Sequence, residues 1–231
     1  MIPADLLQKI RASVPAGKKI TLLAYGSSNT ERFLPGMHWF DILELALRDT
    51  HGRFHQCVNT GVSGDTSRGL LNRFDQDAAG FSPCLAIITI GGNDSNADSG
   101  IPVDEFSENL VTLHKQFAAI KCATIFQTYY SPDPAQCGDL TSFYDYMERV
   151  RRTARDLNAP LVDHLRRWEA FRLAHPARYA RLMQDGFHLN RHGNAVLGLD
   201  LARAFGANLA MASDSFWDEA LEIQGLMDAL H

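Results

Sequence analysis

The stretch K-I-T-L-L-A-Y-G-S-S-N at residues 19–29 decides the fold. Its nearly continuous apolar run is typical of a strand that helices cover on both faces. Gly26 permits a tight turn directly after the run. Ser28 follows in that turn, so its hydroxyl is expected at the carboxyl end of the first strand and at the head of the next helix.

Four more β-rich runs follow along the chain, and helical patterns separate them. The expected strands cover residues 19–25, 54–59, 85–90, 123–130 and 160–162. The expected helices cover residues 39–48, 67–79, 103–120, 140–157, 166–182 and 191–205. Strands that alternate with crossover helices predict an α/β protein, here a three-layer α/β/α sandwich with a five-stranded, mostly parallel sheet.

Three polar, glycine-containing segments begin where expected strands end. They are Ser28 with its neighbours, residues 59–66 and residues 91–94. Ligands bind beyond the carboxyl ends of parallel strands, so these segments are expected to meet at one edge of the sheet. Each segment alone is explained as well by helix capping or an ordinary turn, and Ser27 competes with Ser28 as the reactive hydroxyl.

A fourth segment, Asp185-Gly186-Phe187-His188, supplies an acid and a base three residues apart. On a turn both side chains can face the same way, so the carboxylate can hold the Nδ1–H of the imidazole. Ester hydrolysis by serine also needs a nucleophile and oxyanion donors, and Ser28, Gly64 and Asn93 can fill these roles. The four segments therefore predict a serine hydrolase.

Composition and charge exclude several other classes. The 231-residue chain carries a net charge of -5 and no Lys/Arg run, which argues against a nucleic-acid partner. The four cysteines include no C-x-x-C pair, so reduced thiols are expected. His188 and His192 lack a suitably spaced third ligand, so neither a metal nor another cofactor is expected. Without a signal-peptide pattern or an apolar run of about 20 residues, the expected location is cytoplasmic, with no membrane partner.

Taken together, the four segments resemble the SGNH hydrolases, also called the GDSL esterase/lipase family, over roughly residues 19–207. The resemblance implies a flavodoxin-like parallel sheet and the hydrolysis of carboxylic esters. One position departs from the family pattern, because Gly26-Ser27-Ser28 stands where the family usually has Gly-Asp-Ser. The departure changes the hydrogen bonding of the turn but removes no member of the triad.

The resemblance also implies roles for five residues. Ser28 is similar in position to the family's nucleophile, and Asp185 and His188 to its D-x-x-H dyad. The backbone of Ser28, together with Gly64 and Asn93, would form the oxyanion hole.

The resemblance does not by itself name the substrate, because the family includes short-chain esterases, carbohydrate acetylesterases, lysophospholipases and thioesterases. The segment at 59–64 together with the late D-G-F-H most resembles the bacterial carbohydrate acetylesterase branch. Trp39, Tyr129 and Tyr130 are expected to contact a hydroxylated small-molecule substrate. We expect hydrolysis of acetyl esters through an acyl-enzyme. The alternatives are a lysophospholipase or thioesterase, a catalytically silent SGNH-like binding module, and a flavodoxin-type nucleotide binder.

Residues 1–210 are expected to form one catalytic domain, and residues 211–231 a C-terminal amphipathic helix. The apolar stripe of this helix consists of Phe216, Trp217, Leu221 and Met227. The helix either packs on its own domain or contributes to a homo-oligomer.

Overall fold

A computed structural model of the chain describes residues 2–32, 36–210 and 215–231. It contains a parallel sheet with the strand order β2-β1-β3-β4-β5. The strands are β1 (Ile20–Gly26), β2 (His55–Asn59), β3 (Leu85–Thr89), β4 (Ala123–Gln127) and β5 (Leu161–Val162). Every residue of β1 and β3 is buried, as their continuous apolar runs predict. The expected α/β class and five-stranded parallel sheet are confirmed.

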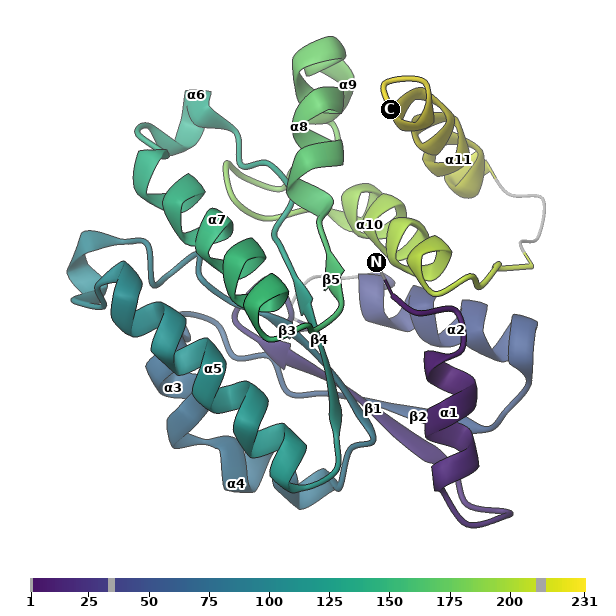
Figure 1. Cartoon of the computed structure of the whole chain (residues 1–231). Helices are drawn as coiled ribbons and strands as arrows, with labels where there is room; N and C mark the ends of the chain where they lie inside the picture. The colour runs from purple at the N-terminus through teal and green to yellow at the C-terminus, as the bar shows by residue number, and fades with distance from the viewer. Residues whose placement is uncertain (1, 33–35, 211–214) are drawn as a thin grey trace. The chain divides into compact units, whose positions relative to one another are not determined.

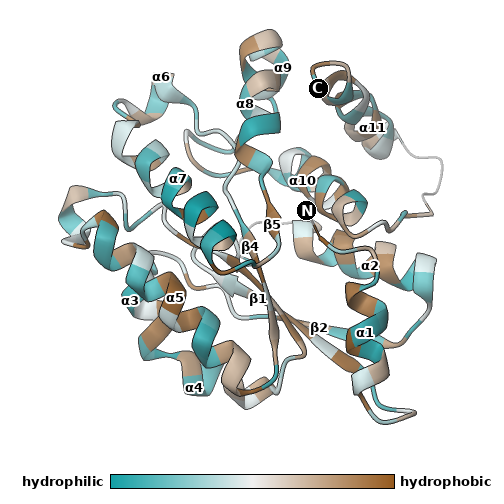
Figure 2. Cartoon of the chain, viewed as in Figure 1, coloured by the Kyte–Doolittle hydropathy of each residue, from teal (hydrophilic) through white to brown (hydrophobic). Residues whose placement is uncertain are grey.

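The described chain forms two compact units, each built from separate stretches. The first unit comprises Met1–Arg32, Arg53–Tyr129 and Leu140–Val162, and it holds the whole sheet. Its helices are α1 (Leu6–Ser13), α3 (Ser67–Asn72), α4 (Phe74–Asp77), α5 (Val103–Ala119), α7 (Thr141–Asp156) and the 3-10 turns η1 (Ala79–Phe81) and η2 (Ala97–Ser99). In Figure 1, α5 and α7 cover one face of the sheet and α1 lies on the opposite side. Figure 2 shows apolar residues along the strands and mostly hydrophilic residues on α7.

The second unit comprises Phe33–Gly52, Tyr130–Asp139 and Asp163–His231. Its helices are α2 (Trp39–His51), α6 (Pro134–Cys137), α8 (His164–Ala174), α9 (Pro176–Ala180), α10 (Arg191–Ala204) and α11 (Ser215–Asp228). Helix α10 packs against both α2 and α11, and α11 also contacts α8. The expected C-terminal helix is therefore present and packs within this unit, although residues 211–214 of the expected segment lie outside the described residues.

Two helices that the sequence predicts as continuous are interrupted. The helix expected at 166–182 divides into α8 and α9 at Pro176, whose ring and missing N–H are incompatible with a helix interior. The helix expected at 67–79 divides into α3, α4 and η1, and Arg73 stands at the first break. Among the described residues, no helix combines the length and apolarity that a bilayer crossing requires.

Candidate active site

The first of the four predicted catalytic segments is a tight turn at the end of β1. The carbonyl of Ser27 accepts backbone hydrogen bonds from Thr30 (2.9 Å) and Glu31 (3.0 Å), and these bonds close the turn around Ser28. The turn requires glycine at position 26, because a Cβ there would lie 2.3 Å from the carbonyl oxygen of Thr89. Ser28 is thus held directly beyond the carboxyl end of the strand.

The two serines of the turn have different surroundings. Ser27 is 1% exposed, and its hydroxyl shares a 2.9 Å hydrogen bond with the phenol of Tyr129. Ser28 is half-buried. Of the two hydroxyls that the sequence leaves in competition, Ser28 is the more accessible, which favours it as the nucleophile.

The loop after β2 is tied to the nucleophile turn by side chains at its start. Asn59 donates from Nδ2 to the carbonyl of Thr30 (2.6 Å) and accepts at Oδ1 from the backbone of Gly61 (3.0 Å). Further along, Gly64 is exposed and has a φ of +78°, a conformation that glycine adopts without strain. The backbone N–H of Gly64 is therefore carried on a loop anchored to the Ser28 turn.

Arg73 joins the same two segments from the break between α3 and α4. Its guanidinium donates to the carbonyls of Gly26 (3.0 Å) and Thr60 (2.6 Å) and to the carboxylate of Asp65 (2.7 Å). It also lies over the ring of Tyr25, 4.5 Å from the centroid. Nothing in the sequence distinguishes Arg73, because a lone arginine within an amphipathic pattern is typical of a solvated position.

The segment after β3 places an amide beside the Gly64 loop. Asn93 Nδ2 donates to the carbonyl of Asp65 at 2.7 Å, so the first unit brings together two of the three predicted oxyanion residues, Gly64 and Asn93. The next residue, Asp94, is buried and accepts from the backbone N–H of Ser67 at 2.8 Å. Burial raises the pKa of the Asp94 carboxyl.

The acid and base of the fourth segment form a hydrogen-bonded dyad in the second unit. His188 Nδ1 lies 2.9 Å from Asp185 Oδ2, and Asp185 Oδ1 accepts from the backbone N–H groups of Phe187 (2.7 Å) and His188 (2.8 Å). Partial burial raises the pKa of Asp185, but these donors outweigh it and the net pKa is lowered. A carboxylate that stays ionised can orient the imidazole and leave Nε2 to act on the substrate side.

The three side chains expected to contact substrate are all buried. Trp39, Tyr129 and Tyr130 are 1%, 2% and 2% exposed, respectively. The hydroxyls of both tyrosines bond to protein groups, Tyr129 to Ser27 and Tyr130 to the carbonyl of Phe187 at 2.6 Å. The structure therefore places none of the three on an open surface, and substrate contact by them stays a prediction.

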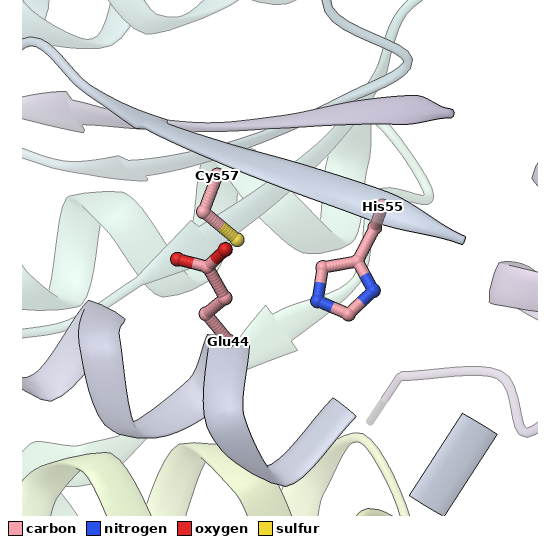
Figure 3. Close-up of side chains that lie close together, drawn as sticks. All are labelled: Glu44, His55 and Cys57. Atoms are coloured by element: carbon pink, nitrogen blue, oxygen red, sulfur yellow. The ribbon is translucent and has the colours of Figure 1, made fainter. Parts of the chain in front are cut away.

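Other potential metal ligands lie apart from these segments. Figure 3 shows His55 and Cys57, which alternate along β2 and so project from the same face of the strand. They stand at the start and middle of the strand, whereas three of the four predicted catalytic segments follow strand ends. The other histidine of the His188/His192 pair, His192, lies 3.5 Å from Glu219 of α11.

Comparisons with known proteins place the chain in a family. Residues 24–196 match the GDSL-like Lipase/Acylhydrolase family. A stretch of 81 residues is 33% identical to Esterase TesA of Pseudomonas aeruginosa, covering 35% of this chain and 39% of that protein. The match thus spans about two fifths of the curated relative's length.

Solved structures share the architecture. A catalytic mutant of Axe2, an acetylxylan esterase from Geobacillus stearothermophilus, has a TM-score of 0.70 and 21% identity, over 86% of this chain and 100% of that one. The lipase/acylhydrolase from Enterococcus faecalis has a TM-score of 0.67 and 22% identity, over 84% and 100%. The acetyl xylan esterase AlAXEase has a TM-score of 0.71 and 19% identity, over 80% and 99%. At these identities the likeness shows the fold, and the SGNH hydrolase fold expected from the sequence is confirmed.

The family match covers most of the chain, including all four catalytic segments. The chain belongs to the GDSL-like lipase/acylhydrolase family of carboxylic ester hydrolases.

Proposed function

We propose that the protein is a serine esterase that removes acetyl groups from a small hydroxylated substrate, with carbohydrate as the favoured class. The observation that carries the proposal is the Asp185–His188 dyad, in which the carboxylate lies 2.9 Å from Nδ1 of the imidazole. A base oriented in this way has one established use in this family of hydrolases, which is to activate a serine.

In the proposed reaction, Ser28 Oγ attacks the ester carbonyl while His188 Nε2 takes the hydroxyl proton. The negative charge that develops on the carbonyl oxygen is stabilised by the backbone N–H groups of Ser28 and Gly64 and by the side-chain amide of Asn93. Collapse of this tetrahedral species breaks the bond to the alcohol, which leaves with the proton from His188. A water molecule then attacks the acetyl-Ser28 ester, gives its proton to His188, and releases acetate as Ser28 recovers its proton.

The preference for acetyl esters rests on two supports. The structures with which the chain shares its fold include two named as acetylxylan esterases. In addition, the family resemblance of the segment at 59–64 points toward carbohydrate acetylesterases. No apolar lid of the kind a long acyl group requires is expected from the sequence.

Active-site labelling tests the mechanism. A fluorophosphonate forms a stable covalent adduct with an activated serine, so peptide mapping should place the label on Ser28 in the wild type and find none in Ser28→Ala. Ser27→Ala is the matched control, because it removes the neighbouring hydroxyl and should retain the label on Ser28. Label on Ser27 would show that Ser27, and not Ser28, is the nucleophile. A wild type that neither takes label nor hydrolyses p-nitrophenyl acetate would instead be a silent binding module.

A substrate panel tests the acyl group and its carrier. We expect kcat/KM for p-nitrophenyl acetate to exceed that for the octanoate, and we expect acetate release from acetylated xylose. A higher kcat/KM for octanoyl esters, lysophospholipids or acyl thioesters would favour the lysophospholipase or thioesterase alternative while leaving the serine mechanism intact.

A further inference from the structure

Two consecutive tyrosines follow β4, and each bonds a different part of the proposed catalytic machinery. Tyr129 belongs to the first unit and Tyr130 to the second. Both rings are packed against other aromatic side chains, Tyr129 edge-on to Phe143 at 6.0 Å and Tyr130 against Trp168 at 5.5 Å. The position of each hydroxyl is therefore fixed by the packing of its own unit.

The hydroxyl of Tyr129 bonds the residues that precede two catalytic groups. It shares a 2.9 Å hydrogen bond with the hydroxyl of Ser27, the residue before the nucleophile Ser28. The backbone N–H of Gly92, the residue before Asn93, also bonds this phenol oxygen. Burial raises the pKa of Tyr129, so the phenol stays protonated across the neutral range. One buried neutral group thus links the nucleophile turn to the oxyanion turn.

The hydroxyl of Tyr130 bonds the residues on both sides of the catalytic base. It donates to the carbonyl of Phe187 at 2.6 Å and accepts from the backbone N–H of Leu189 at 3.1 Å. His188 lies between these two residues, so its backbone is held from both sides while its ring meets Asp185. These contacts lie within the second unit.

We propose that Tyr129 and Tyr130 are positioning residues, Tyr129 for the nucleophile and the oxyanion donor and Tyr130 for the base. The proposal rests on the proposed esterase function. It gives both tyrosines a role other than the substrate contact expected from the sequence. It also accounts for Ser27 at the position of the family's usual aspartate, because a neutral hydroxyl is a compatible partner for a buried neutral phenol.

Replacement by phenylalanine isolates the hydroxyls, because the ring and its packing are retained. For Tyr129→Phe and for Tyr130→Phe we expect kcat for p-nitrophenyl acetate to fall by about tenfold to a hundredfold, since small displacements of catalytic groups cost this much. KM should stay within about twofold of the wild type, because neither hydroxyl is assigned to substrate. The rate of fluorophosphonate labelling at Ser28 should fall by a similar factor.

Tyr146→Phe is the matched control for loss of a buried hydroxyl. Tyr146 is 7% exposed, and its hydroxyl donates to the carbonyl of Ile101, outside the four catalytic segments. It should lower the melting temperature like the other two variants and leave kcat unchanged. A second check is the double variant Ser27→Ala/Tyr129→Phe, in which both hydroxyls of this pair are removed, so that the Ser27 hydroxyl is not left buried without its partner. Its kcat should match that of Tyr129→Phe alone.

Three results would overturn the proposal. Values of kcat in Tyr129→Phe and Tyr130→Phe that match the Tyr146→Phe control would leave both hydroxyls a structural role only. A raised KM with unchanged kcat would instead support substrate contact by the two tyrosines. A wild type that turns over no ester would overturn the proposed function as well, which distinguishes that failure from the first two.

Discussion

Asn93 Nδ2 donates a hydrogen bond to the backbone carbonyl of Asp65 at 2.7 Å. The amide is thereby fixed beside the Gly64 loop before a substrate arrives. One N–H of the amide is committed to Asp65, and the second is the one we assign to the oxyanion. A donor held in advance stabilises developing charge without reorganisation, which is the condition under which such donors contribute most.

Asn93→Ala should therefore lower kcat by about 10²- to 10³-fold and leave KM nearly unchanged, because the contact strengthens in the transition state. Steady-state kinetics with p-nitrophenyl acetate measure both constants. Asn96→Ala is the matched control, since Asn96 is exposed and its side chain only caps η2. An unchanged kcat in Asn93→Ala would remove this amide from the mechanism.

Replacement of Arg73 is expected to affect both stability and activity. Its side chain is 16% exposed, and replacement by alanine removes the ion-pair partner of Asp65 and one donor to each of the carbonyls of Gly26 and Thr60. We expect Arg73→Ala to lower the free energy of unfolding by about 3 kcal/mol, as for other buried ion pairs broken from one side. It should also lower kcat, because the turn at Gly26 and the loop at Thr60 lose a common anchor.

Chemical denaturation measures the stability change, and Arg68→Ala is the control. Arg68 pairs with Glu105 in solvent, with 47% of its side chain exposed, so its removal should have a much smaller effect. Equal losses in the two variants would contradict the assigned role of Arg73.

The contrast between Arg73 and the catalytic residues shows what the sequence could predict about the site. The sequence predicts roles for Ser28, Gly64 and Asn93 because each follows an apolar strand in a parallel sheet, and for His188 because it shares a turn with Asp185, and these catalytic roles stay predictions. The contacts of Arg73 could not be predicted, because they depend on carbonyls 13 and 47 residues away in the chain. The buried environment of the tyrosines was likewise hidden, since an aromatic pair after a strand suits a binding surface as well as a core.

For the fold, local patterns sufficed for all five strands and failed at the helix breaks. An apolar run after each turn marks a strand, because the sheet is buried on both faces. The interruption at Pro176 has a local cause that the sequence contains. The interruption at Arg73 does not, because it accompanies the long-range contacts that this side chain makes. The first helix, α1, was not predicted, because its eight residues repeat the helical pattern too few times to stand out.

Asp185→Asn tests the orienting role of the dyad. The amide has similar size, but its NH₂ group facing Nδ1 would favour the wrong tautomer of His188. We expect kcat to fall by about 10²- to 10⁴-fold across the pH range while KM changes little. Because the pKa of Asp185 is lowered, its protonation should not limit activity in the range where a free aspartate titrates. An acid limb in kcat/KM that persists in Asp185→Asn would agree with this, and one that disappears would contradict it.

The Asp200 side chain on α10, which is 9% exposed, predicts how the free energy of unfolding depends on pH. Its carboxylate lies 3.2 Å from His164 Nδ1 and 2.9 Å from Arg167 Nε, and it accepts from the indole of Trp168 at 3.1 Å. Burial raises the pKa of Asp200, but these partners outweigh it and the net pKa is lowered. The contribution of the cluster to stability is therefore full above the ordinary aspartate pKa of about 4 and is lost as pH falls through the lowered value.

Asp200→Asn should accordingly lower the free energy of unfolding by about 3 kcal/mol at neutral pH, with a difference from wild type that shrinks as pH falls. Urea denaturation at a series of pH values measures this. Asp228→Asn is the control, because Asp228 also pairs with Arg167 but is 43% exposed and screened by solvent. A difference in the free energy of unfolding that grows toward acidic pH would contradict the predicted pH dependence.

Helix α11 offers two neighbouring positions that separate packing from self-association. Ile223 is 1% exposed, whereas Leu221 is 49% exposed, so only the first is engaged in the contacts of α11 within its unit. Ile223→Asp would bury a charge without a partner and should lower the free energy of unfolding by more than about 2 kcal/mol. Leu221→Asp should leave the free energy of unfolding unchanged.

We propose that the exposed face of α11 contributes to a homo-oligomer. Leu221→Asp should therefore shift the mass measured by light scattering toward the monomer, while Ser28 still takes the fluorophosphonate label. Identical masses for Leu221→Asp and wild type would exclude this face as the interface and leave α11 with its packing role alone.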